Sequence, residues 1–236
     1  MTQSKNLILL GSFVCLTSCV HTSTSRTSTT SSTSANSSEG PKHNTDDDIV
    51  ESLRQGNIRF TSHQRIHPRQ DKARVLEQAN SQAPGAILVS CSDSRVPPEV
   101  IFDHGLGDIF SVRTAGHALD VYTVASIEYA IEHLGSKVVV VMGHTSCGAV
   151  AAAMHTPAGK STGSKNIDQL VKKIRPGLSP FDPADKELVQ AERNNIAATI
   201  ADLKLSSPLV RAELEKKHLT IVSALYFLKS GDVELW

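Results

Sequence analysis

The stretch KVVVVMGHTSCG, residues 137–148, decides how the chain folds. Its four consecutive valines form a continuous apolar run, which is typical of a parallel-sheet strand that is covered on both faces. Residue types that bind metals follow directly after this run. The stretch therefore predicts a buried strand over residues 137–142 that leads into a functional loop.

A second stretch, AILVSCSDSR at residues 86–95, has the same organisation. A short apolar strand over residues 86–90 is followed by Cys91, Asp93 and Arg95. In open α/β sheets, sites are built at the carboxyl ends of strands. We therefore expect the two loops to converge on one crevice.

Helical and extended segments alternate around these two strands. Such alternation indicates an α/β fold with a mainly parallel central β-sheet flanked by helices. The expected helices span residues 46–60, 70–82, 121–134 and 183–205, and the further strands span residues 109–113 and 219–228, the latter turning into a short final strand.

Cys91, His144 and Cys147 are of the ligand types that Zn²⁺ prefers. His144 and Cys147 are spaced i and i+3, so they share one side if a helical turn starts there. Three protein ligands leave a fourth position open for water, whereas a structural zinc module normally has four Cys or His ligands in close pairs. The spacing therefore predicts a catalytic Zn²⁺ site.

Asp93 and Arg95 follow Cys91 by two and four residues and can form a carboxylate–guanidinium pair. Such a pair keeps the carboxylate ionised and can hold it off the metal, ready to accept a hydrogen bond from a metal-bound hydroxide. A structural salt bridge in a loop is the alternative.

The N-terminal segment is interpreted as a targeting signal. Residues 1–19 have the short apolar run of a signal peptide, and their end, Leu16-Thr17-Ser18-Cys19, resembles a bacterial lipobox. That resemblance implies cleavage before Cys19 and lipidation of Cys19, and an ordinary cleaved signal peptide is the alternative. We expect residues 20–45, rich in Ser and Thr, to be a disordered tether, and residues 46–236 to be the functional domain.

This targeting signal predicts a location in the bacterial cell envelope, on the periplasmic or the outer-surface side. The protein would contact the membrane only through its lipid anchor. Incorporation of labelled palmitate in the native host tests lipidation, and its absence would remove this expectation.

The composition gives no indication of a nucleic-acid-binding protein or of a disulfide-rich protein. Lys and Arg together equal Asp and Glu at 24 each, so the net charge gives no indication of a nucleic-acid partner. Of the four cysteines, only Cys91 and Cys147 lie in the expected domain, too few for a disulfide framework.

Over roughly residues 47–236 the sequence resembles the β-class carbonic anhydrases. The motifs that carry the resemblance are CSDSRVPPEVIFDHGLGDIF at 91–110, SIEYAIEHLG at 126–135, GHTSCGAV at 143–150 and ALYFLKSGDVEL at 224–235. Because the motifs are several and separated, chance is a poor explanation.

The resemblance implies reversible hydration of CO₂ to bicarbonate and a proton by zinc-bound hydroxide, in a homodimer or a higher homo-oligomer. It implies that Cys91, His144 and Cys147 bind zinc and that Asp93 and Arg95 form the catalytic dyad. The resemblance also implies that Gln82 and the Gly148 N–H donate hydrogen bonds to the substrate. It implies that Phe110 and Tyr129 line the CO₂ pocket and that His133 helps to move protons. Each of these residues could instead be an ordinary surface or core residue.

One position distinguishes the subtypes. A second type of this family closes the aspartate onto zinc and has a tryptophan where this chain has Leu88. The arginine of that type has a match in Arg113, but the family keeps an arginine there widely. We therefore expect the open, plant-like type. His117 stands where the family usually has asparagine, and it could relay protons or cap a helix.

Two other functions remain open. A hydrolase that acts on CS₂ or COS could use the same scaffold with a reshaped, more apolar entrance. A non-catalytic zinc-binding or redox envelope protein is the other alternative, although a redox pair is normally a close C-x-x-C.

Overall fold

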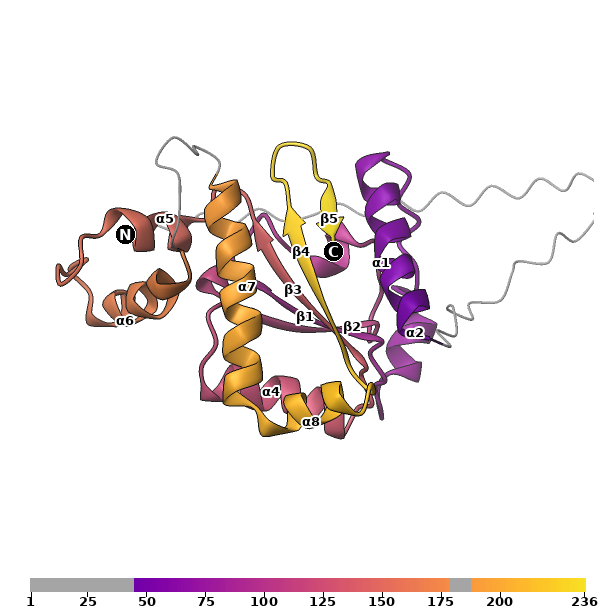
Figure 1. Cartoon of the computed structure of the whole chain (residues 1–236). Coiled ribbons are helices and arrows are strands. Elements are labelled where there is room, and N and C mark those ends of the chain that lie inside the picture. The colour runs from indigo at the N-terminus through magenta and orange to yellow at the C-terminus, as the bar shows by residue number, and fades with distance from the viewer. Residues whose placement is uncertain (1–44, 179–187) are drawn as a thin grey trace, which may run out of the picture. The chain divides into compact units, whose positions relative to one another are not determined.

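The computed structural model describes residues 45–178 and 188–236 (Figure 1). The expected signal peptide, the lipidation site Cys19 and nearly all of the tether lie outside these residues, as do residues 183–187 of the expected fourth helix. Within the described part of the chain, no helix has the length and apolar character needed to cross a bilayer.

A five-stranded sheet forms the centre of the domain, in the order β2-β1-β3-β4-β5. The first four of these strands run parallel, and only the pairing of β4 with β5 is antiparallel. The expected α/β fold with a mainly parallel sheet is confirmed. The strands are β1 (Ala86–Cys91), β2 (Ile109–Thr114), β3 (Val138–His144), β4 (Thr220–Tyr226) and β5 (Val233–Leu235).

The described part of the chain has eight α-helices, of which two precede the first strand and six lie between strands. They are α1 (Asp46–Thr61), α2 (Lys72–Glu77), α3 (Pro98–Ile101), α4 (Val121–Glu132), α5 (Gly148–His155), α6 (Lys165–Ile174), α7 (Val189–Ser206) and α8 (Pro208–Glu215), with the 3-10 turns η1 (Ala115–His117) and η2 (Arg175–Gly177).

The helix expected over residues 70–82 is much shorter in the structure. Asp71 caps its start by accepting from the Arg74 N–H, and α2 ends at Glu77 with no buried residue. Without burial, so short a helix has little to offset its nucleation cost, so the chain leaves the helix early.

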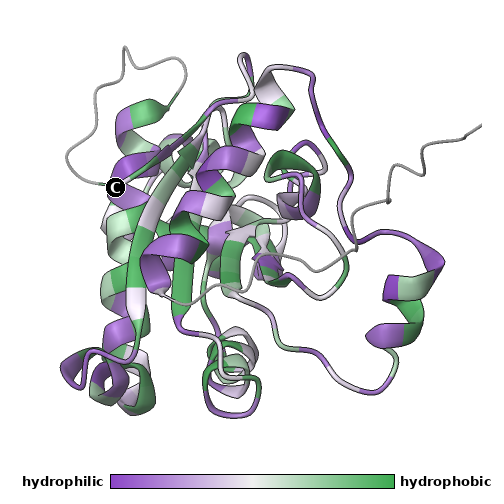
Figure 2. Ribbon diagram, turned by 90° about the vertical axis from the view of Figure 1, so that its right-hand side faces the viewer, coloured by the Kyte–Doolittle hydropathy of each residue, from purple (hydrophilic) through white to green (hydrophobic). Residues whose placement is uncertain are grey.

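Helices cover both faces of the sheet. Residues of β1 alternate between two cores, with Ile87 and Val89 packed on the side of α4 and α7, and Ala86 and Leu88 on the side of α1. In Figure 2 the central strands are largely green, whereas the helices alternate between green and purple. Each fully buried aliphatic side chain contributes about 1.5–3 kcal/mol, so this two-sided burial fixes the strands firmly.

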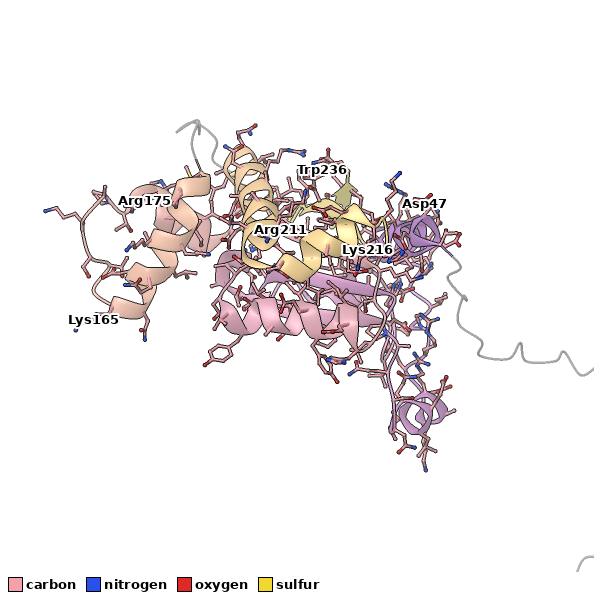
Figure 3. The ribbon with its side chains drawn as sticks, turned by 60° about the horizontal axis from the view of Figure 1, so that its bottom comes forward. Asp47, Lys165, Arg175, Arg211, Lys216 and Trp236 are labelled. Carbon is pink, nitrogen blue, oxygen red and sulfur yellow. The ribbon has the colours of Figure 1, made fainter. Side chains whose placement is uncertain are left out.

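A smaller core lies beyond the carboxyl edge of the sheet. It joins Cys91 and Cys147 to apolar residues of α5 and α6, including Val150 and Ile174. Figure 3 labels Lys165 and Arg175 at the two ends of α6, and Arg175 donates to the carbonyl oxygens of Ala153 and Thr156 at the end of α5. These bonds hold α5 and α6 together beside the strand ends.

Candidate metal centre

Adjacent parallel strands bring the two predicted loops together. β1 and β3 pair in register, with Ser90 opposite Met142, so Cys91 and His144 end neighbouring strands at the same edge. Gly143 allows helix α7 to pack closely against this strand end, because a Cβ there would lie 3.0 Å from Ile196 Cδ1. The predicted convergence at the carboxyl ends of the strands is therefore found.

Cys91, His144 and Cys147 form a buried cluster. Their ligand atoms all lie within 4.8 Å of one another, and the two Sγ atoms are 3.9 Å apart. The helical turn that the i and i+3 argument required does not start at His144, because His144 ends β3, Ser146 has a φ of +57°, and Cys147 is the N-cap of α5. A tight non-helical turn brings Cys147 to the same side instead.

The His144 ring is oriented for coordination. Its Nδ1 lies 3.0 Å from the Thr145 carbonyl oxygen and so carries the proton. Its Nε2 is buried and has no hydrogen-bond partner. A buried polar atom normally has a partner, so the bare Nε2 beside two sulfur atoms fits a metal ion.

Backbone N–H groups donate to one of the two thiols. Those of Asp93 and Gly116 donate to Cys91 Sγ at 3.4 and 3.3 Å. The pKa of Cys91 is lowered chiefly because Cys147 donates a hydrogen bond to it, and the pKa of Cys147 is raised for the same reason. Burial alone would lower the pKa of His144, but the adjacent Cys91 raises it. A bound cation would favour the thiolate form of both cysteines.

Asp93 and Arg95 form the pair that the sequence predicts. Arg95 Nε and a terminal guanidinium nitrogen donate to the two carboxylate oxygens at 2.9 and 2.7 Å, and the Arg95 N–H adds a third bond at 2.9 Å. These bonds lower the pKa of Asp93 well below its usual range. One carboxylate oxygen lies 3.9 Å from His144 Nε2, so the ionised group faces the cluster while Arg95 holds it.

Arg113 fixes the backbone of this loop. It donates from Nε to the Cys91 carbonyl oxygen at 3.1 Å and from a terminal nitrogen to the Asp93 carbonyl oxygen at 2.8 Å. Leu88 is buried in β1, where the second subtype would have a tryptophan. In this chain Arg113 therefore supports the loop that carries the cluster.

The remaining predicted site residues lie at different distances from the cluster. Gly148 is exposed at the start of α5, directly after Cys147, and open space lies around its Cα. Gln82 is exposed in the loop before β1. Tyr129 is 49% exposed on α4 and packs on the exposed His133 with ring centroids 5.1 Å apart.

Phe110 lies far along the sheet from the cluster. It is half-buried on the edge strand β2 and pairs with Ile87. Cys91 is four residues beyond Ile87, so Phe110 sits about 13 Å down the strand from the cluster. Within one chain, the structure does not bring Phe110 to Cys91.

His117 is fully buried in the turn η1 and does not cap a helix. Its Nδ1 lies 3.0 Å from Thr199 Oγ1, and its Nε2 lies 3.2 Å from Asn195 Nδ2 and 3.6 Å from a Glu192 carboxylate oxygen. The capping alternative is thereby excluded.

Glu192, Asn195 and Thr199 lie against the turn η1 beside the cluster, and the sequence analysis missed them. All three are buried on one face of α7, and both carboxylate oxygens of Glu192 lack a hydrogen-bond partner. Their spacing of i, i+3 and i+7 was an available signal, since three polar residues on the inner face of a helix are unusual.

The fold and the cluster together define a class. A mainly parallel α/β sheet that carries two thiols, one bare imidazole and an ionised carboxylate at its carboxyl edge has the residues that can hold a metal ion.

Comparison with known proteins identifies the family. The family model described as "Carbonic anhydrase" matches residues 86–233. A carbonic anhydrase of Mycolicibacterium smegmatis is 37% identical over 185 residues, which cover 78% of this chain and 90% of that protein. Carbonic anhydrase 2 of Mycobacterium tuberculosis is 35% identical over 192 residues, which cover 78% of this chain and 89% of that protein.

Solved structures share the fold. The β-carbonic anhydrase CafA of Aspergillus fumigatus superposes with a TM-score of 0.61 at 24% identity, covering 80% of this chain and 88% of that one. A tetrameric β-carbonic anhydrase of Sordaria macrospora has the same TM-score at 23% identity, with coverage of 79% and 94%. The chain belongs to the carbonic anhydrase family and is an enzyme, and it shares the fold of β-carbonic anhydrases.

Proposed function

We propose that the protein catalyses the reversible hydration of CO₂ to bicarbonate and a proton, with a zinc ion held by Cys91, His144 and Cys147. The observation that carries the proposal is the buried cluster itself, with ligand atoms within 4.8 Å and a bare His144 Nε2. Two thiolates and one imidazole suit Zn²⁺, and such a set leaves one position for solvent. Bound zinc would supply the Lewis acidity that makes a water molecule nucleophilic near neutral pH.

Asp93 has the role of proton acceptor in this proposal. The three bonds from Arg95 keep its carboxylate ionised and turned toward the guanidinium. The oxygen that faces His144 Nε2 can accept a hydrogen bond from the nucleophile and orient it toward CO₂. Arg95 acts through Asp93 and holds the carboxylate off the metal.

Gly148 and Gln82 are proposed to bind the substrate. The Gly148 N–H lies in the first turn of α5, where backbone donors have no partner within the helix. Such a donor stabilises the negative charge that develops on bicarbonate oxygens. Gln82 is exposed in this chain, so its amide is available for the same purpose.

Phe110 and Tyr129 can line a CO₂ pocket only if a second copy brings them to it. The edge of β2 is unpaired in the described chain, and next to it α4 exposes Val121 and Tyr122 by 71% and 79%. Unpaired edges flanked by exposed apolar side chains are sites of association. We propose that two copies meet here and that each supplies Phe110 and Tyr129 to the other's site.

Light scattering of the purified protein is expected to give a dimer or a multiple of it. Val121→Glu places a charge in the proposed interface, so it should yield monomers with lower CO₂ hydration per zinc. An exposed residue on α7, Leu205, provides the matched control as Leu205→Glu. A wild-type monomer with full activity would contradict the proposed interface.

Stopped-flow measurement of CO₂ hydration tests the activity directly. The protein is expected to hydrate CO₂ rapidly, to lose the activity when a chelator removes its zinc, and to regain it when Zn²⁺ is added back. CS₂ and COS serve as competing substrates. Faster turnover of CS₂ than of CO₂ would favour the other hydrolase, and stoichiometric zinc with neither activity would favour a non-catalytic zinc protein.

A further inference from the structure

The turn η1 makes direct contact with one of the two thiols. The Gly116 N–H donates to Cys91 Sγ at 3.3 Å. Such N–H···S bonds control how much negative charge a thiolate gives to a bound metal. The position of this single N–H therefore bears on the proposed zinc site.

This turn has an unusual backbone that needs support. Gly116 and His117 both have positive φ, at +59° and +45°. A side chain at residue 116 would also be crowded, because a Cβ would lie 2.7 Å from Ile174 Cδ1 and 3.1 Å from Ala149 Cβ. Two consecutive left-handed residues, one of them a histidine, persist only where surrounding groups hold them.

Helix α7 supplies that support through Asn195. Its Nδ2 donates to the Gly116 carbonyl oxygen at 3.0 Å and lies 3.2 Å from His117 Nε2. An amide NH₂ has two hydrogens, so it can donate to both. His117 Nε2 is then the acceptor, and Nδ1–H donates to Thr199 Oγ1 at 3.0 Å.

This arrangement also accounts for Glu192. Because His117 Nε2 accepts from Asn195, it has no proton for the Glu192 oxygen at 3.6 Å, and the two Glu192 oxygens indeed have no hydrogen-bond partner. Asn195, His117 and Thr199 thus form one consistent buried chain of donors and acceptors that ends at Gly116.

We propose that Asn195 and His117, held in place by Thr199, are positioning residues that fix the Gly116 N–H on the Sγ of Cys91. They limit the charge that this thiolate gives to the metal and keep the sulfur in place for binding. The proposal rests on the proposed zinc site and adds a function for helix α7, which supplies none of the three ligands.

Metal binding by the full chain tests this inference without measuring activity. Asn195→Leu keeps the approximate size of the side chain and removes both donated bonds. We expect its zinc affinity, measured by competition with a chelator, to fall about tenfold, as for other residues that orient metal ligands. In the Co²⁺-substituted protein, the sulfur-to-metal charge-transfer band should move to longer wavelength, because the Cys91 thiolate loses a hydrogen bond.

A second pair of variants tests the proposal even if Asn195→Leu misfolds. Thr199→Val removes the hydroxyl that holds His117, and it should shift the Co²⁺ band in the same direction by a smaller amount. Thr199→Ser restores the hydroxyl and should restore the band. If Asn195→Leu does not fold, this pair decides the question.

Asn57→Leu is the matched structural control. Asn57 is buried in α1 and, like Asn195, donates to carbonyl oxygens, here of Ile101 and Gly231. It should lower the thermal unfolding midpoint and leave the Co²⁺ band unmoved. The inference is overturned if Asn195→Leu and Thr199→Val have wild-type affinity and band position, or if Asn57→Leu shifts the band equally. A wild-type chain that binds neither zinc nor Co²⁺ would instead refute the proposed zinc site.

Discussion

Cys91→Ala and His144→Ala are each expected to lose bound zinc and to reduce CO₂ hydration to the uncatalysed background. The three ligand atoms lie within 4.8 Å in a buried cluster, so removing one leaves two, which is too few for a stable catalytic zinc site. Elemental analysis of the purified variants gives the zinc content, and stopped-flow hydration gives the rate.

Two neighbours control for effects on folding. Ser92→Ala alters the exposed residue next to Cys91, and His155→Ala removes an exposed histidine at the end of α5. Both should keep stoichiometric zinc and near wild-type rates. Retention of zinc and full activity by Cys91→Ala or His144→Ala would refute the ligand assignment.

The sheet could be predicted from sequence because its strands carry strong local signals. The four valines of 138–141 are apolar on both faces, which is typical of a covered parallel strand, and the structure buries all of them. The helix expected over residues 70–82 lacked such a signal. Its length depends on whether another element covers Val75 and Leu76, and in this chain both remain exposed.

The site was predictable only in part, because some of its contacts depend on the tertiary structure and have no local sequence signal. Cys91 and His144 end adjacent strands, so topology alone brings them together. The i and i+3 argument places Cys147 beside His144 only if a helical turn starts there, whereas in the structure a left-handed Ser146 places it. The contact between Gly116 and Asn195 joins positions 79 residues apart, and no local pattern encodes which face of α7 meets the turn η1.

Asp93→Asn is expected to keep zinc and to lower CO₂ hydration by about 10²- to 10⁴-fold, the usual contribution of a positioned proton acceptor. Cys91, His144 and Cys147 are unchanged in this variant, so binding should persist. The carboxylate accepts hydrogen bonds from Arg95 on both oxygens, whereas an asparagine amide has only one oxygen. Its NH₂ group would face a guanidinium N–H, so two donors would meet. The variant therefore loses both the acceptor and its orientation.

The pH dependence of the wild type follows from the same bonds. Arg95 lowers the pKa of Asp93, so the carboxylate keeps its charge as the pH falls from neutral to mildly acidic, and protonation requires stronger acid than for an ordinary aspartate. A crystal structure at mildly acidic pH should accordingly show Asp93 still bound to Arg95 and off the metal. Asp93 on zinc in that structure would identify the closed type of site.

Asp168→Asn is the matched control for Asp93→Asn. Asp168 also has a lowered pKa, caused by Ser161 and Thr162, but it lies in the first turn of α6 and is no part of the cluster. The same loss of one negative charge there should leave hydration unchanged. If Asp93→Asn matched the wild-type rate while Asp168→Asn behaved as expected, Asp93 would have no part in proton acceptance, and its pairing with Arg95 would be structural, the alternative that the sequence left open.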